Sequence, residues 1–271
     1  MLPTFVIGLR EGLEAALIVG IIAAFLTRNG DRRSLRLMWL GVFGAVAFSF
    51  GLAAVIQVTN HRASFRTREL IEGALTLVAV AGVSYMILWM KHHAGELREE
   101  LETKASAAIA GRSALALIAT AFFAVIREGI ETAIFLIAAF AQSNNPQAAG
   151  TGAILGVALA VAIGLGVYRG GLRFDLRRFF RVTGILLVFI AAGLVSSAVH
   201  EFTEAGFITF GTTPAINLST LIPPGTLRGG LLGAFLGLEP VPTYVEVCSW
   251  FTFFIPMVWL TTRTPRTAVV A

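Results

Sequence analysis

The sequence predicts an all-α polytopic membrane protein with seven transmembrane helices. Of its 271 residues, 56% are hydrophobic and only 14% are charged, and the mean hydropathy is +0.80. Soluble domains carry roughly 25% charged residues, so this composition excludes a soluble enzyme, a disordered chain and a disulfide scaffold. A bilayer core about 30 Å thick is crossed by roughly 20 apolar residues in a helix. Seven stretches are long enough: 2–26, 37–58, 70–90, 113–141, 151–168, 182–199 and 241–262.

The first stretch is interpreted as a helix rather than a cleaved signal peptide, because it lacks a basic beginning and carries three charges. Of the 21 Lys and Arg residues, 15 lie in the connections after the first, third and fifth stretches and in the C-terminal tail. Because cytoplasmic loops carry the excess of basic residues, we expect the N-terminus outside and the C-terminus in the cytoplasm. This topology also accounts for the net charge of +5, so no nucleic-acid partner is expected.

The first and fourth stretches contain the same motif, Arg-Glu-Gly-apolar-Glu, at 10–14 and again 117 residues later at 127–131. Helices one to three therefore match helices four to six. Because three is an odd number, the second unit enters the membrane from the opposite side. Such inverted repeats are the plan of many secondary transporters, and we expect one repeat to move against the other. The single predicted domain, 1–271, consists of repeat one at about 1–91, repeat two at about 112–205, an external loop at 205–242 and a last helix at 241–262.

The motif charges lie near the middle of the hydrocarbon, since Glu11 is about 13–14 Å along the helix from the start of the first stretch. A charge at the bilayer centre costs at least about 2.5–3.5 kcal/mol, so these charges need partners. The alternative is two Arg–Glu pairs that only hold helices together. Because these pairs would leave two carboxylates without a positive partner, a bound cation is the interpretation we favour. Carboxylates suit Mg, Ca, Mn and hard iron better than copper or zinc. The candidate site consists of Glu11, Glu14, Glu128 and Glu131, with Arg10 and Arg127 as charge partners.

A second polar set lies at the external ends of the third, sixth and last stretches. It contains two glutamate pairs at i, i+3 spacing, and each pair presents one helix face. We interpret the set as a vestibule that concentrates cations, and the alternative is ordinary helix-end charges that reach the headgroups. Its members are Glu69, Glu72, His200, Glu201, Glu204 and Glu246.

The remaining stretches are interpreted as scaffold. Small residues recur at every fourth position in the fifth and second stretches and predict close helix packing, and the four tryptophans are interpreted as interfacial belts. We expect a short cytoplasmic helix in the charged connection 91–112, and a re-entrant or interfacial segment at 227–238. The small residues are Gly152, Gly156, Ala160 and Gly164 in the fifth stretch and Gly41, Ala45 and Ser49 in the second.

The paired REGLE and REGIE motifs resemble those of the high-affinity iron permease family, also called oxidase-dependent iron transporters. The resemblance extends over nearly the whole chain, including the Glu72-Gly73 opening of the third helix, the HEFTEAG end of the sixth and the external LIPPGTLRGGLLGAFLGLEPVPT segment. It implies uptake of iron across the cytoplasmic membrane, with the four motif glutamates as the translocating acids. It also implies ferric ion delivered by an external oxidase or peroxidase, a periplasmic iron-binding protein as partner, and no cofactor beyond the transported iron.

Two other functions are compatible with the motifs. A transporter of manganese or another divalent ion would use the same carboxylates. An intramembrane metal-dependent hydrolase would use His200-Glu201-x-x-Glu204, which resembles the His-Glu-x-x-His of zinc proteases with Glu204 in place of the second histidine. The hydrolase would leave the charges of the first and fourth helices without a purpose. We therefore expect a transporter and not an enzyme.

Overall fold

The computed structural model describes residues 1–28, 32–62, 64–93, 114–141, 143, 145–168, 176–220, 222 and 240–263. Within these residues the fold is all-α, as predicted, and an isolated bridge between Pro214 and Thr243 is the β pairing that it contains. The predicted cytoplasmic helix beyond His93 and the predicted segment at 227–238 lie outside the described residues. The helices are α1 (Leu2–Arg28), α2 (Arg32–Arg62), α3 (Phe65–His93), α5 (Ala114–Ala141), α6 (Pro146–Tyr168), α7 (Leu176–Glu204) and α9 (Tyr244–Thr262).

Each of the seven predicted stretches is one of these helices, and most helices extend past the apolar stretch by a few residues. By length and composition, α2, α3, α6, α7 and α9 are suited to cross a membrane. The helices α1 and α5 are also long and largely apolar, but each carries three charges of the repeated motif in its middle. The chain is therefore a multi-pass membrane protein, and α1 and α5 differ from its other long apolar helices in carrying charges in the middle rather than near the ends.

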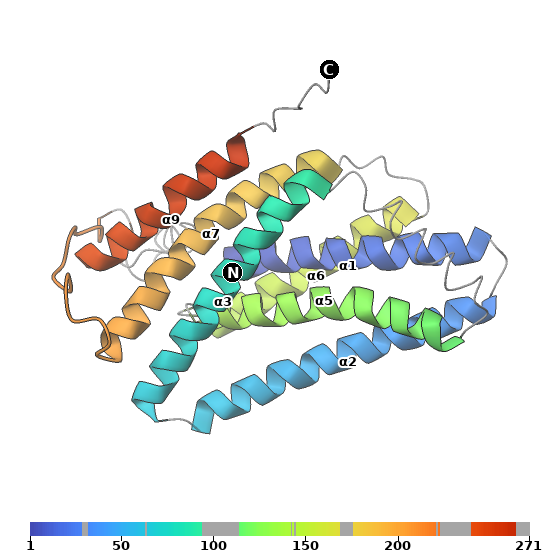
Figure 1. The fold of residues 1–271 in the computed structure, drawn as a ribbon, viewed down its shortest axis with the longest axis horizontal. Coiled ribbons are helices and arrows are strands. Elements are labelled where there is room, and N and C mark those ends of the chain that lie inside the picture. Colours follow the sequence, from blue (N-terminus) through green and yellow to red (C-terminus); the bar gives the residue numbers. More distant parts are fainter. Residues whose placement is uncertain are drawn as a thin grey trace, which may run out of the picture.

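The helices pair between the two predicted repeats rather than within them. α1 packs along α6, α2 along α5, and α3 along α7, while α9 packs against α7 (Figure 1). Exchanging α1, α2 and α3 with α5, α6 and α7 turns the α1–α6 pair into the α5–α2 pair and leaves the α3–α7 pair unchanged. This is the pattern expected of two repeats related by a two-fold axis. The pairs α1–α6, α2–α5 and α3–α7 each join one repeat to the other, so the helices do not group by repeat, and the motion of the repeats expected from the sequence stays a prediction.

The helices form two units instead. α1, α2, α5 and α6 make a four-helix unit, and α3, α7 and α9 make a three-helix unit that crosses it in the view of Figure 1. The units meet mainly where α3 contacts α5 and where α7 contacts α1. The two motif helices, α1 and α5, contact each other inside the four-helix unit, so the motifs lie next to the boundary between the units.

Small residues line the two long helix pairs, as predicted. The stripe on α6 faces α1 so closely that a Cβ added at Gly152 or Gly156 would meet α1 backbone. The stripe on α2 faces α5 in the same way, because a Cβ at Gly41 would meet the backbone carbonyl of Ile118. The absence of side chains at these positions lets the helix backbones approach each other.

The glycine inside each motif belongs to the same contacts. A Cβ at Gly12 of α1 would lie 3.0 Å from the Ala160 Cβ of α6, and a Cβ at Gly129 of α5 would overlap the Ser49 hydroxyl of α2. Each motif helix is thus pressed against its partner on the glycine side. The motif carboxylates therefore do not lie in the α1–α6 and α2–α5 contacts, which the glycines occupy.

The end of α7 and the start of α9 are joined by backbone hydrogen bonds through the residues that follow α7. α7 ends at a glycine with positive φ, Gly206, and the Phe207 N–H donates to the Phe202 carbonyl, which closes the last turn. The chain then pairs with the start of α9, where the Tyr244 N–H donates to the Thr213 carbonyl. As a result, polar residues near the end of α7 lie beside polar residues at the start of α9.

Candidate metal centre

The α1 motif is buried. Arg10, Glu11 and Glu14 are 1%, 1% and 6% exposed. The Arg10 guanidinium lies between the two carboxylates, with Nη1 3.5 Å from Glu11 Oε1 and Nη2 3.5 Å from Glu14 Oε1. Nη1 also donates to the Met86 Sδ of α3 at 3.0 Å. Charge-assisted hydrogen bonds are shorter, at about 2.7–2.9 Å, so a single arginine is shared loosely between two buried acids.

The α5 motif has the same sequence pattern in a more open setting. Glu128 is 5% exposed, whereas the side chains of Arg127 and Glu131 are 47% and 23% exposed. Arg127 Nε donates to Glu131 Oε1 at 3.1 Å and lies 3.9 Å from Glu128 Oε1. The Arg127 guanidinium carbon is 5.2 Å from the centroid of the Trp89 ring of α3, which is within cation–π range.

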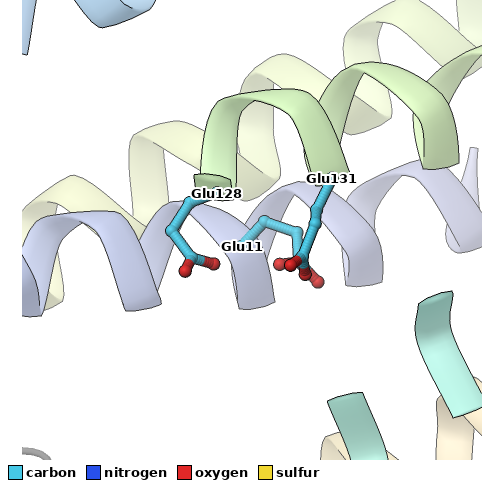
Figure 2. Close-up of side chains that lie close together, drawn as sticks. All are labelled: Glu11, Glu128 and Glu131. Carbon is cyan, nitrogen blue, oxygen red and sulfur yellow. The ribbon is translucent and has the colours of Figure 1, made fainter. Parts of the chain in front are cut away.

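The two motifs meet in a cluster of three carboxylates, from Glu11 of α1 and from Glu128 and Glu131 of α5 (Figure 2). One oxygen of each carboxylate lies within 4.8 Å of the other two. Both oxygens of Glu11 and the Oε2 atoms of Glu128 and Glu131 are buried and have no hydrogen-bond partner among the described residues. Buried polar groups are normally hydrogen-bonded, and buried charges are paired or bind metal. We call these residues the three-carboxylate cluster, and a cation would supply the partner that its oxygens lack.

Glu14 is the one predicted acid outside the three-carboxylate cluster. Its Oε1 faces Arg10 Nη2 instead. The structure therefore brings together three of the four predicted acids, and Arg10 lies 3.5 Å both from Glu11, inside the cluster, and from Glu14, outside it. Both motif arginines lie beside the acids, with Arg10 at Glu11 and Glu14 and Arg127 at the other two.

Three of the acids predicted at the external ends also meet. Glu69 and Glu72 of α3 and Glu201 of α7 each place one carboxylate oxygen within 4.8 Å of the others. Glu69 is 8% exposed, and Glu72 accepts a hydrogen bond from Arg68 Nε at 2.8 Å. We call Glu69, Glu72 and Glu201 the outer acidic cluster. It lies wholly within the three-helix unit.

The other three predicted outer residues form a chain beside this cluster. His200 Nδ1 is 3.0 Å from Glu246 Oε1, and His200 Nε2 is 3.5 Å from Glu204 Oε1. The Glu246 Oε2 atom accepts a hydrogen bond from the Thr243 N–H at 3.1 Å, which completes a capping box at the start of α9. Glu246 thus caps α9, a role that the Thr243-x-x-Glu246 spacing could have indicated, and it connects α9 to α7 through His200, which the sequence alone does not reveal.

Sequence reasoning missed two side chains of α3 that contact the motifs, Met86 and Trp89. From the sequence Trp89 is interpreted as an interfacial residue, but its ring faces the Arg127 guanidinium. Trp250 is buried inside the protein, since it is 5% exposed and its ring stacks on Phe254 with centroids 4.5 Å apart. Met86 and Trp89 are three positions apart and so share one helix face, but no pattern in the sequence connects that face with the arginines.

Comparison with known proteins adds independent evidence. The iron permease FTR1 family matches residues 1–263 of the chain. The chain is 37% identical over 273 residues to the ferrous iron permease EfeU of Escherichia coli O6:H1 (strain CFT073), which covers 100% of this chain and 99% of that protein. It is 36% identical over 268 residues to the ferrous iron permease EfeU of Yersinia pestis, which covers 98% of this chain and 95% of that protein. No solved structure matches the chain.

Proposed function

The chain belongs to the iron permease FTR1 family, and we propose that it carries iron ions into the cell through the three-carboxylate cluster. As a member of a permease family it is a transporter and not an enzyme. The proposed location is the cytoplasmic membrane, with the N-terminus outside and the C-terminus inside, because the basic residues favour that orientation. The proposed frame is a 3+3 inverted repeat plus a last helix, supported by the exchange pattern of the helix pairs.

One observation supports this function above the others. The two motif helices place three buried carboxylates together, and four of their oxygens have no hydrogen-bond partner among the described residues. A structural clasp would pair each carboxylate with an arginine, but Glu11 has only a loose contact with Arg10, at 3.5 Å. Oxygen ligands and concentrated negative charge suit a hard cation such as iron. A loosely satisfied site also suits transport, because the ion has to leave again.

The outer acidic cluster is the proposed first station for the ion. It lies at the external ends of α3 and α7, while the opposite end of α7 carries Arg178 and Arg181. A cation is therefore attracted at the outer end and not retained at the inner end. An inside-negative membrane potential adds about 2.3 kcal/mol per charge per 100 mV, and this drive requires no coupling ion.

The oxidation state and the partners of the transported iron complete the proposal. The relatives are named ferrous iron permeases, whereas the resemblance of the motifs implied ferric ion from an external oxidase system and a periplasmic iron-binding protein. Uptake by vesicles supplied with Fe²⁺ under ascorbate is compared with uptake of Fe³⁺ citrate by the same vesicles. Uptake of Fe²⁺ under ascorbate alone favours the substrate in the relatives' names. Uptake of Fe³⁺ citrate, or uptake from Fe²⁺ without ascorbate that depends on an added oxidase, favours the other.

The test of the site is radio-iron uptake by proteoliposomes that contain the wild-type protein or a Glu→Gln variant of the cluster. Glu11→Gln and Glu128→Gln keep the side-chain volume and remove the charge, so we expect uptake to fall to background. Glu100→Gln, in the charged connection outside the described residues, is the matched control and should transport like the wild type. Wild-type uptake by both cluster variants would overturn the site assignment.

The two other functions have less support. A tenfold excess of Mn²⁺ that abolishes iron uptake would favour a broader divalent-ion transporter. For the hydrolase, both ring nitrogens of His200 face carboxylates of Glu246 and Glu204, and the compared relatives are named permeases. His200→Ala with full iron uptake and unchanged proteolysis would remove that alternative.

A further inference from the structure

Both motif arginines contact the same face of α3, which belongs to the other unit of the protein. Arg10 Nη1 donates to the Met86 Sδ, and the Arg127 guanidinium lies 5.2 Å from the centroid of the Trp89 ring. Met86 and Trp89 are separated by about one helical turn. The helix that faces the metal centre from across the boundary thus contacts the motifs through their two positive charges.

The two contacts differ in how freely the arginine can move. Arg10 is 1% exposed and is enclosed by Glu11, Glu14 and Met86. The side chain of Arg127 is 47% exposed, so it can rotate without displacing packed neighbours. A guanidinium slides over an aromatic face at little cost because the attraction is electrostatic and weakly directional.

Arg127 is also the charge that competes with a bound ion. Its Nε is 3.1 Å from Glu131 and 3.9 Å from Glu128, and these two acids supply two of the three carboxylates of the cluster. A cation that takes those oxygens repels the guanidinium at close range. In a medium of low dielectric constant the displaced charge needs a new partner, and the Trp89 ring is already beside it.

We propose that Trp89 is a positioning residue for iron binding, whose ring holds the Arg127 guanidinium when that group gives up Glu131 and Glu128 to the ion. The inference rests on the proposed function of the three-carboxylate cluster and assigns a role to a residue outside the motifs. Because Trp89 belongs to α3, occupation of the site is linked to the position of the three-helix unit. Release follows when the guanidinium returns to the acids and displaces the ion.

The test measures Fe²⁺ uptake under ascorbate in proteoliposomes, as KM and Vmax, together with Fe²⁺ affinity of the purified protein by calorimetry. Trp89→Leu removes the aromatic face, and we expect KM and Kd to rise by at most about fivefold, the size of one partly exposed cation–π contact, because part of that contact is already made before the ion binds. Trp89→Phe keeps a face and should recover most of the affinity. Trp259→Leu is the matched control, because Trp259 forms a cation–π pair with Arg263 at the end of α9 and should leave KM unchanged.

The double variant separates positioning from general packing. In an Arg127→Gln background the guanidinium is absent, so Trp89→Leu should cause no further change in Kd. An equal rise in Kd with and without Arg127, or a wild-type Kd in Trp89→Leu, overturns the proposal. If Trp89→Leu fails to elute as a folded protein, the order of affinity Trp, then Phe, then Met at this position decides in its place. Absence of iron uptake by the wild type would instead overturn the proposed function.

Discussion

The two copies of one motif occupy different surroundings. In α1 the arginine is buried and shared between two acids at 3.5 Å each, whereas in α5 the arginine is half-exposed and bound to one acid at 3.1 Å. The acids differ as well, since α1 contributes one carboxylate to the three-carboxylate cluster and α5 contributes two. Identical residue patterns therefore have unequal roles. In the α1 copy a buried arginine neutralises part of the charge of two buried acids, and the α5 copy supplies the more accessible side of the metal centre.

The difference arises from the helices that surround the motifs. The helix pairs α1–α6 and α2–α5 are equivalent under exchange of the repeats, and they place Gly12 and Gly129 in matching contacts. The helices α3 and α7 are not equivalent at the metal centre, because α3 brings Met86 and Trp89 to the arginines and α9 packs against α7. A repeat in the sequence thus determines the scaffold of the site, while the unrepeated side chains of the third helices determine how each copy works.

The largest expected difference between the copies is in stability. Arg10→Gln leaves Glu11 and Glu14 buried without their cation, and removing one partner of a buried ion pair costs about 3–5 kcal/mol. Arg127→Gln removes a half-exposed charge, and we expect a loss of unfolding free energy below about 1 kcal/mol. Thermal unfolding in detergent, followed by tryptophan fluorescence, gives the order of the two Tm values. Equal Tm losses would contradict the assignment of Arg10 as a fixed, buried charge and of Arg127 as an accessible one.

A second difference concerns the two acids of the α1 motif. Glu11→Gln removes a carboxylate of the cluster, so Fe²⁺ affinity should fall about tenfold or more, as for other truncated buried charge contacts. Glu14 faces Arg10 and lies outside the cluster, so Glu14→Gln should weaken Fe²⁺ binding by about threefold at most. Calorimetry on the purified variants makes the measurement. A larger loss from Glu14→Gln than from Glu11→Gln would place the ion on the opposite side of Arg10.

Much of the fold was predictable because few kinds of segment can cross a membrane. The hydropathy of the chain predicts each of the seven described helices, and the repeated motif indicates that α1 and α5 belong together. The sequence could not show that Glu11 would join the cluster while Glu14 stayed outside it, because both acids lie beside Arg10 and only the packing of α1 against α5 decides which carboxylate meets those of α5. The capping role of Glu246 could have been predicted from the Thr243-x-x-Glu246 spacing, but its contact with His200 could not, because His200 lies on another helix.

The glycines are where the two copies should behave most alike. Gly129→Ala pushes a methyl group into the Ser49 hydroxyl, which itself donates to the Ala45 carbonyl at 2.9 Å, and overpacking of this kind costs about 1–3 kcal/mol. Gly12→Ala meets the Ala160 Cβ at 3.0 Å and should cost somewhat less. The second-site changes Ser49→Gly and Ala160→Gly should each restore the Tm of the matching alanine variant and not of the other. Restoration by the wrong partner would contradict the helix pairing.

The smallest expected effect is at Met86, where we expect a change in stability without the change in KM that is expected at Trp89. Met86→Leu keeps the volume and removes the thioether that accepts from Arg10 Nη1, a weak hydrogen bond whose loss should cost about 0.5–1 kcal/mol of unfolding free energy. If Arg10 is a fixed charge that keeps its acids during transport, KM for Fe²⁺ remains at the wild-type value. A Tm scan and an uptake assay on Met86→Leu and Trp89→Leu side by side distinguish the two residues: Met86→Leu lowers the Tm and leaves KM unchanged, whereas Trp89→Leu raises KM in addition to any loss of Tm from its packing against the core. If Met86→Leu instead raised KM and left the Tm unchanged, Arg10 would be a mobile charge, and the distinction between the two motifs would fail.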